Sequence, residues 1–317
     1  MAEEDDVELP YWSRTYCGFR ERFVEPYVMQ LSDTASLSLR QAPCVSAEHA
    51  KEAKATSDGS CTASTVWDAG IVLAAHVYER EEREASGQQK QERTSDDGAR
   101  TCLDLGSGTG IVGLAAAASG VYDRVVLTDL PSVLPLLEQN AERNRDACAG
   151  TDVSAVSLRW DDDRELHEVV RRFGPFDLIV GGDLLYRPQV VAPLLTALRA
   201  LATTQTTVLL AASLQHSPET IRLFSERAEA SGYTVERLGA EAHAAGFTSE
   251  EVRLLRLGVA RRSVASTQPS RREATQGDDA ATSRTSNQPG AGGSASTSEH
   301  NGGRARTAKR ARVEDDT

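Results

Sequence analysis

A glycine-rich turn is the first feature of this sequence whose residue types and spacing suit chemistry. It lies in the segment TCLDLGSGTGIVGLAAAASG, residues 101–120, between an apolar stretch and an alanine-rich one. Gly106 and Gly108 permit a tight turn and a close approach of the backbone to a ligand, and the helix that follows offers unpaired N–H groups. The pattern predicts a site for an adenosine-bearing ligand, without deciding which one.

The position of the glycines relative to the strand separates two kinds of ligand. Residues 108–113 match the dinucleotide signature G-x-G-x-x-G, which is a weak signal on its own. The strand ends at Leu105, however, and in the frame that begins at Gly106 the last position is Ile111 instead of glycine. Asp104, inside the strand end, would lie unfavourably beside a pyrophosphate but suits a cationic amino acid group. A sulfonium cofactor with an α-amino group is such a ligand.

Asp129 closes the second strand of this region, in VVLTDLP. It follows Gly106 by 23 positions, close to the spacing of about 20 residues at which an acidic side chain meets the ribose hydroxyls of a nucleotide. The alternative is that Asp129 is the N-cap of a helix that begins near Pro131. The ribose role is favoured because the glycine turn lies upstream.

A third candidate is the segment FDLIVGGDLLYRP, residues 176–188. It is an apolar strand that ends in two glycines and is followed by Asp183 and Tyr186. Ligands of a doubly wound sheet bind at the carboxyl ends of its strands, so both side chains would reach the same cleft as Gly106 and Asp129. The alternative is a strand-to-helix turn in which Asp183 accepts hydrogen bonds from backbone N–H groups.

Strands and helices that could position these residues alternate from residue 101 onward. The expected strands are 101–105, 124–128, 153–158, 176–181, 207–212, 233–238 and 252–258. The expected helices are 110–119, 131–145, 188–202 and 217–231, preceded by one within residues 64–80. Because this alternation requires crossover connections, the sequence predicts an α/β fold with a doubly wound, mostly parallel, seven-stranded sheet.

The composition divides the chain into a partly mobile N-terminal extension (1–60), a folded domain (61–260) and a disordered tail (261–317). The tail has no aromatic residue, and its only larger aliphatic side chains are Val264 and Val313. Such a segment cannot bury enough apolar surface to offset its ordering entropy. The polar stretches 42–64 and 84–98 are expected to be surface loops or insertions.

Charge and cysteine content narrow the classes of partner and compartment. The net charge of −12 divides into +3 in the tail and −15 in residues 1–260. A folded region with this much negative charge is unsuited to binding nucleic acid, because contacts with phosphates require clustered lysine and arginine side chains. The five cysteines show no C-x-x-C pair, and no apolar run is long enough to span a bilayer. We therefore expect a cytoplasmic monomer with reduced thiols, no bound metal and no membrane segment.

Six segments together resemble one family. STVWDAGIVLA, LDLGSGTGIVGL, VVLTDLP, LLEQNAERN, LRWDDD and FDLIVGGDLLY occur in the order seen in seven-β-strand, S-adenosylmethionine-dependent protein lysine methyltransferases. The chain is similar to the subgroup that modifies molecular chaperones, AAA-type ATPases and elongation factors. The likeness runs from about residue 60 to residue 258, apart from the stretch 84–98, and residues 240–251 have no clear counterpart. It implies a class I methyltransferase fold, S-adenosyl-L-methionine as the cofactor and a protein substrate that presents a lysine.

The resemblance also assigns roles to individual positions. The backbone of the glycine turn would lie against the methionine portion of the cofactor, Asp129 would bind the ribose, and Trp160 would lie near the adenine. Trp67 resembles a second aromatic residue that borders the cofactor in this family, although a tryptophan is more often part of a hydrophobic core. The predicted cofactor-binding residues are Trp67, Asp104, Gly106, Ser107, Gly108, Asp129, Trp160 and Gly182. The predicted catalytic residues are Asp183 and Tyr186, which match a D-x-x-Y element that receives the target lysine.

Methyl transfer requires a neutral amine behind the methyl carbon, in line with the departing sulfur. A free lysine is neutral in only about one molecule in a few thousand at pH 7. A carboxylate beside an ammonium favours the charged form, so Asp183 cannot simply remove the proton. Our hypothesis is that Asp183 captures and aligns the ammonium, and that Tyr186 and backbone carbonyls complete the geometry. The sulfonium charge and the closed cleft then lower the pKa of the lysine, and its proton leaves to water.

Other functions remain open at this stage. They are a dinucleotide-dependent oxidoreductase, a binding module that retains the fold without catalysis, and a methyltransferase for a small molecule or nucleic acid. In the tail, Lys309-Arg310-Ala311-Arg312 fits a short nuclear import signal, for which a solvated charge run is the alternative. The sequence therefore predicts a protein lysine methyltransferase of the cytoplasm, with the tail as a candidate route into the nucleus.

Overall fold

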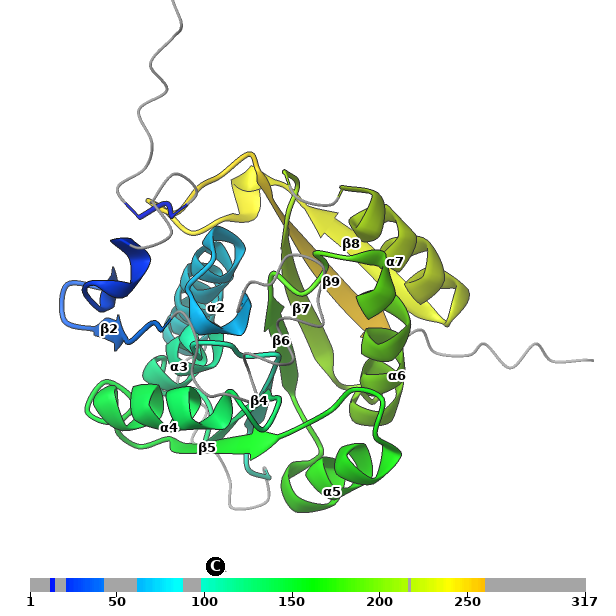
Figure 1. Ribbon diagram of the computed structural model, residues 1–317, viewed down its shortest axis with the longest axis horizontal. Coiled ribbons are helices and arrows are strands. Elements are labelled where there is room, and N and C mark those ends of the chain that lie inside the picture. Colours follow the sequence, from blue (N-terminus) through cyan, green and yellow to red (C-terminus); the bar gives the residue numbers. More distant parts are fainter. Residues whose placement is uncertain (1–11, 15–20, 43–61, 88–97, 216–217, 260–317) are drawn as a thin grey trace, which may run out of the picture. The chain divides into compact units, whose positions relative to one another are not determined.

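A seven-stranded sheet organises the protein in the computed structural model, which describes residues 12–14, 21–42, 62–87, 98–215 and 218–259 (Figure 1). Its strand order is β5-β4-β3-β6-β7-β9-β8. The strands are β3 (Thr101–Leu105), β4 (Arg124–Asp129), β5 (Asp152–Ser157), β6 (Leu178–Gly182), β7 (Thr207–Ser213), β8 (Tyr233–Leu238) and β9 (Val252–Val259). Strands β3 to β7 run parallel, and β9 is antiparallel to both β7 and β8. The predicted doubly wound, mostly parallel fold is confirmed.

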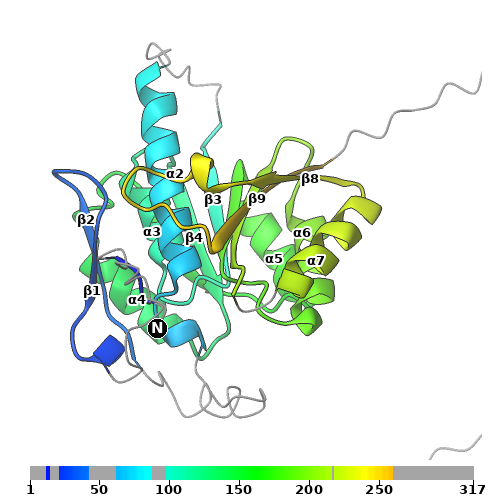
Figure 2. The ribbon, with the colours of Figure 1, turned by 90° about the horizontal axis from the view of Figure 1, so that it is seen from above.

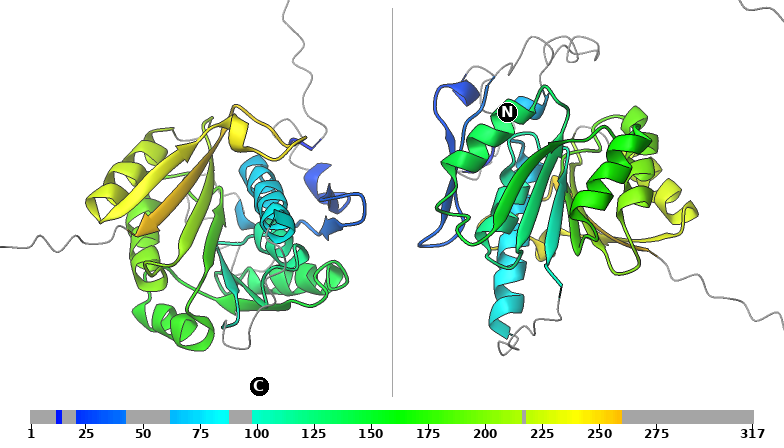
Figure 3. Two further views of the ribbon diagram at one scale, coloured as in Figure 1. Left: turned by 180° about the vertical axis from the view of Figure 1, so that it is seen from behind. Right: turned by 90° about the horizontal axis from the view of Figure 1, so that it is seen from below.

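Helices cover both faces of the sheet (Figures 2 and 3). One face carries α2 (Asp68–Gly87), α3 (Ile111–Ala118) and α4 (Leu134–Arg143), and the other carries α5 (Asp163–Phe173), α6 (Val191–Leu201) and α7 (Pro218–Ala230). Strand β3, TCLDL, carries apolar side chains that point to both faces of the sheet. The side chain of Cys102 packs in the core on the α2 side, whereas Leu103 and Leu105 pack in the core on the α6 side. A parallel strand covered on both faces needs apolar side chains on both.

The chain reverses its direction of sheet growth at β3. Strands β4 and β5 are added on one side of β3, and the chain then crosses back so that β6 pairs with the other side. The carboxyl ends of β3, β4 and β6 consequently meet at one edge, on either side of the switch point. This is where doubly wound sheets bind their ligands.

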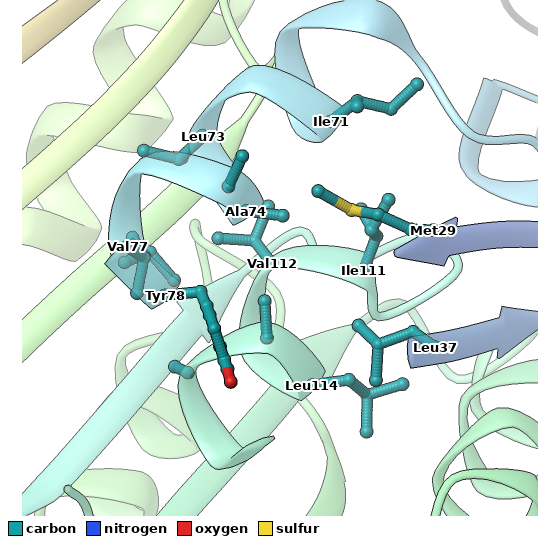
Figure 4. Close-up of a cluster of buried hydrophobic side chains, with 14 of the residues drawn as sticks. Met29, Leu37, Ile71, Leu73, Ala74, Val77, Tyr78, Ile111, Val112 and Leu114 are labelled. Carbon is teal, nitrogen blue, oxygen red and sulfur yellow. The ribbon is translucent and has the colours of Figure 1, made fainter. Parts of the chain in front are cut away.

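A short N-terminal hairpin was not predicted from the sequence. Strands β1 (Tyr27–Gln30) and β2 (Ser36–Leu39) pair antiparallel and lie outside α3 and α4. Met29, Leu37 and Leu39 are fully buried, and Figure 4 shows Met29 and Leu37 packed toward Ile111 and Leu114 of α3. Part of the predicted N-terminal extension therefore belongs to the main core.

Two helices differ from the prediction, and three predicted segments lie wholly or largely outside the described residues. Helix α5 was not predicted, because its sequence is mostly charged; it buries Leu166, Val169 and Phe173 at helical spacing. Helix α2 continues to Gly87, into the stretch 84–98 that was predicted to be a loop, and residues 62–64 form the short helix η2 (Thr62–Ser64). Most of the stretch 42–64, the rest of 84–98 and the whole tail, with its basic signal, lie outside the described residues.

Three more short helices connect these elements: η1 (Glu21–Phe23), η3 (Pro188–Val190) and η4 (Ala240–Ala242). Within the described residues, none of the helices is both long enough and apolar enough to cross a membrane.

The packing of the hairpin leads to a stability prediction. Leu37→Ala removes buried methyl groups from a side chain that is 0% exposed, and we expect the free energy of unfolding in urea to fall by about 2–4 kcal/mol. Val28→Ala is the matched control, since Val28 lies on the same hairpin but is 62% exposed and should change stability by less than about 0.5 kcal/mol. Equal effects of the two substitutions would mean that the hairpin is not part of the core.

Candidate functional site

A cavity of about 590 Å³ opens at the carboxyl edge of the sheet. Its walls come from η2 and the start of α2, from the β3–α3 turn, from the end of β4, and from the connections that follow β5 and β6. All ten residues predicted as site residues line it: Trp67, Asp104, Gly106, Ser107, Gly108, Asp129, Trp160, Gly182, Asp183 and Tyr186. The structure thus brings together side chains from five separate parts of the sequence.

The β3–α3 turn depends on glycine at two positions. Gly106 and Gly108 have φ angles of 60° and 56°, which other residues adopt at a cost. A Cβ atom on Gly106 would lie 2.9 Å from Leu184 and 3.1 Å from Trp160, and one on Gly108 would lie 3.0 Å from the carbonyl oxygen of Ala63. The turn therefore presents bare backbone to the cavity.

Hydrogen bonds fasten this turn to the end of β4. The backbone N–H of Ser107 donates to the carbonyl of Thr128 at 2.9 Å, and the N–H of Thr128 donates to Ser107 Oγ at 2.9 Å. The N–H of Gly108 donates to Asp129 Oδ2 at 2.8 Å. The turn and the acidic residue that ends β4 are therefore held in one fixed arrangement.

Asp104 has a carboxylate oxygen without a partner. Its side chain is only 1% exposed; Oδ2 accepts a hydrogen bond from the N–H of Gly113 at 2.9 Å, whereas Oδ1 is buried and has no partner among the described residues. Burial raises the pKa of Asp104 from 3.8 to about 7, against the lowering effect of the hydrogen bond from Gly113 and of the nearby Ser107 hydroxyl, and the nearby charge of Asp129 raises it further. An ammonium group placed against Oδ1 would satisfy the oxygen and favour the ionised form. The predicted suitability of Asp104 for a cationic amino acid group thus has a geometric basis.

Asp129 is not a helix cap. Helix α4 begins at Leu134, its N-cap position is Val133, and no side chain caps it. Instead, Asp129 Oδ1 accepts from the N–H of Leu130 at 2.8 Å while Oδ2 accepts from Gly108. The alternative interpretation of Asp129 is therefore wrong. A carboxylate oxygen has two lone pairs and can accept more than one hydrogen bond, so these two contacts are compatible with a ligand hydroxyl at Asp129.

The two tryptophans are walls of the cavity and not core residues. Both are half-buried. Trp67 donates from Nε1 to the carbonyl of Thr62 at 2.7 Å, and the guanidinium of Arg22 lies 5.1 Å from the centre of its ring. Trp160 lies close to Gly106 and lines the same cavity as Asp129. Such flat apolar surfaces suit the rings of an adenosine.

Asp183 has the one positive φ angle, 56°, among the non-glycine residues that the structure describes. This conformation costs about 1 kcal/mol or more for a residue with a Cβ atom, and such strain clusters at functional sites. Its N–H donates to the carbonyl of Ala211 at 2.8 Å, and its Oδ1 accepts from the N–H of Ser213 at 3.2 Å. Asp183 therefore does accept a hydrogen bond from a backbone N–H group, as the alternative interpretation of this turn required. The same contact holds in place a carboxylate that lines the cavity.

Tyr186 and Gly182 complete this wall. Tyr186 is half-buried, with the guanidinium of Arg187 lying 5.5 Å from the centre of its ring. A Cβ atom on Gly182 would lie 3.0 Å from the Cα of Gly70, so Gly182 also permits the close approach of α2 to β6.

Several residues of the cavity were missed by the sequence reasoning. Leu130 and Leu158 line it, and apolar residues that follow strands look the same in sequence as core residues. Arg159, Asp161 and Arg187 line it as well; the first two flank Trp160, which was the available signal. No cluster of three or more possible metal ligands occurs among the residues whose structure is described.

Comparisons with known proteins agree on one family. A family model described as lysine methyltransferase matches residues 49–227. The chain is 25% identical over 210 residues to EEF1A lysine methyltransferase 3 of Xenopus tropicalis, covering 66% of this chain and 83% of that protein. It is 31% identical over 160 residues to EEF1A lysine methyltransferase 3 of Mus musculus, covering 50% and 60%. It is 29% identical over 154 residues to protein N-lysine methyltransferase METTL21A of Danio rerio, covering 49% and 62%. The matched segment thus spans less than two thirds of the mouse and zebrafish proteins.

The environment of Asp104 predicts a pH-dependent stability. Because its pKa in the folded protein, about 7, lies above its ordinary value of 3.8, its contribution to stability is complete below about pH 4 and is lost as the pH rises through about 7. Asparagine does not titrate, so the melting temperature of Asp104→Asn, relative to the wild type, should rise between pH 5 and pH 8. Glu229→Gln, at an exposed position of α7, is the control. A difference that is equal at both pH values would contradict the assignment.

Proposed function

The chain belongs to the lysine methyltransferase family, and on this premise we propose that it transfers a methyl group from S-adenosyl-L-methionine to a lysine side chain of a protein. The observation that carries the proposal is the convergence of all ten predicted residues on one cavity, where Asp104 has a carboxylate oxygen that finds no partner among the residues the structure describes. Membership in this family decides against the dinucleotide-dependent oxidoreductase.

The residues of the cavity fit this cofactor. Asp104 Oδ1 would accept a hydrogen bond from the α-ammonium group, and the bare backbone of the β3–α3 turn would lie along the methionine portion. Asp129 would accept the ribose hydroxyls, and Trp160 with Leu130 and Leu158 would enclose the adenine. When bound, the cofactor supplies an electrophilic methyl group on a positively charged sulfur.

On the lysine side, Asp183 and Tyr186 are the acting residues. The carboxylate of Asp183 is held by its contact with Ser213 at the wall of the cavity. It would capture the lysine as an ammonium and align it, because a carboxylate raises the pKa of an amine and so cannot favour deprotonation. Tyr186 would restrict the lysine side chain to the orientation in which its nitrogen lies in line with the methyl group and the sulfur. Positioning of this kind supplies several kcal/mol of a displacement barrier, and the proton leaves to water.

We also propose a substrate class and a compartment. Two of the relatives are named for EEF1A, and an elongation factor, a molecular chaperone or another ATPase is the substrate class that the family resemblance implies. The net charge of −15 on residues 1–260 suits a basic segment around the target lysine. The protein would act in the cytoplasm, and its tail would permit import into the nucleus.

The proposal is tested with labelled cofactor in a lysate of host cells. Purified protein and isotopically labelled S-adenosylmethionine should label one protein band, and prior alkylation of lysines should abolish the label. Asp183→Asn should label about a hundredfold less, yet bind S-adenosylhomocysteine as the wild type does, since asparagine tolerates a positive φ and keeps the oxygen that accepts from Ser213. Asp146→Asn, at an exposed position, is the control. Full turnover by Asp183→Asn would refute its role.

The import signal is tested separately in cells. Deletion of residues 304–312 removes Lys309, Arg310 and Arg312, and the nuclear fraction of fluorescently tagged, full-length protein should fall severalfold. A deletion of the same length at residues 286–294, which contains no lysine or arginine, is the control. An unchanged distribution after the first deletion would exclude the signal.

A further inference from the structure

Asn140 of α4 and Asn144, the C-cap residue that directly follows α4, hold the open edge of the N-terminal hairpin. Asn140 and Asn144 are one helical turn apart, and both are buried. Asn144 Oδ1 accepts from the N–H of Ser38 at 2.7 Å, and its Nδ2 donates to the carbonyl of Ser38 at 3.0 Å. Asn140 makes the same pair of contacts with Arg40, at 2.8 Å and 3.1 Å. The two side-chain amides thus pair with β2 and the residue after it as a further strand would.

The spacing explains why a helix can do this. Four residues of helix rise about 6 Å, and two residues of a strand rise about 6.6 Å, so Asn140 and Asn144 match the alternate positions Ser38 and Arg40. An open strand edge otherwise presents unpaired backbone groups. The segment LLEQNAERN, which contains both asparagines, therefore has a structural task.

Asn140 makes one contact that Asn144 does not make. Its Nδ2 also donates to the carbonyl of Thr109 at 2.8 Å, and Thr109 is a buried residue of the β3–α3 turn that lines the cavity. The corresponding second donation of Asn144 goes to the carbonyl of Asn140, within its own helix. A single amide thus joins the hairpin to the turn that would hold the cofactor.

We propose that Asn140 is a positioning residue of the cofactor site, and that the docked hairpin acts through it to fix the conformation of the β3–α3 turn. This inference rests on the proposed use of S-adenosylmethionine. Gly106 and Gly108 give the turn little stiffness of its own, so contacts from outside must define it. Ser107 and Gly108 are held by β4, and Asn140 holds the peptide that follows them.

The N-terminal segment also supports a second part of the cavity wall. Gln41 donates from Nε2 to the carbonyl of Arg22 at 2.7 Å, and its Oε1 accepts from Thr65 Oγ1 and from the N–H of Val66, both at 2.8 Å. These residues directly precede Trp67, over whose ring the guanidinium of Arg22 lies. The segment thus contacts the cavity from two sides, which supports a role in forming the cofactor site.

Substitution by aspartate separates positioning from stability. Asn140→Asp and Asn144→Asp each keep the size of the side chain and the accepting oxygen, and each removes two donated hydrogen bonds. The two variants should therefore lose similar amounts of thermal stability. Only Asn140→Asp breaks the contact with the β3–α3 turn.

The readouts are binding and backbone exchange. By calorimetry, Asn140→Asp should raise the Kd for S-adenosylhomocysteine about tenfold, the loss expected when a buried carbonyl loses its partner. Asn144→Asp should stay within about twofold of the wild type. In the ligand-free protein, hydrogen exchange at the amides of residues 106–110 should quicken in Asn140→Asp alone. Should either aspartate variant fail to fold, Asn140→Ser and Asn144→Ser form the same pair.

The outcomes distinguish the two proposals. If the wild type does not bind S-adenosylhomocysteine, the proposed function is wrong. If the wild type binds it, and the variants at positions 140 and 144 show equal Kd values and equal exchange of residues 106–110, Asn140 is a structural residue only and the inference is overturned.

Discussion

The hydrogen bonds between the β3–α3 turn and the end of β4 are the constraint on which the rest of the site depends. The turn contains glycines at positive φ and has little conformational preference of its own. Its shape is imposed by Ser107 bonding to Thr128 and by Gly108 donating to Asp129. The same contacts place Asp129 beside the turn, so the backbone that would meet the methionine portion of the cofactor and the carboxylate that would meet its ribose are set together. The switch point of the sheet then brings the residues that follow β6 to face them.

Two carboxylates at the cavity have different environments and suit different cations. Asp104 is buried, with a raised pKa and an oxygen that lacks a partner among the described residues. Asp183 is only half-buried, and the strained backbone at the end of β6 holds it in place. The first fits a cation that stays enclosed, such as the α-ammonium of a cofactor. The second fits one that enters and leaves, such as the lysine of a protein.

Most of the sheet could be predicted from local signals, and the ten residues proposed as site residues were chosen in the same way and all line one cavity. Strands covered on both faces have apolar sequences, and most of the ten residues lie at or just after the carboxyl end of such a strand; Trp67, which precedes α2, is the exception. The hairpin was missed because four-residue strands such as Ser36–Leu39 carry only two buried side chains. Helix α5 was missed because its charged residues outnumber its apolar residues. The task of Asn140 could not be derived, since its partner Arg40 lies 100 positions away and offers only backbone groups that every residue has.

The place of β9 in the sheet has a consequence for how the protein is made. Among the residues that the structure describes, β9 is the last strand in sequence, yet it lies between β7 and β8. Until the ribosome has added the residues up to Val259, the edge of β7 that pairs with β9 is uncovered. In the finished protein the β7 side chains of Leu209 and Leu210 are at most 1% exposed. An uncovered apolar strand is a template for aggregation. The nascent chain therefore has most need of chaperone protection just before its final strand emerges.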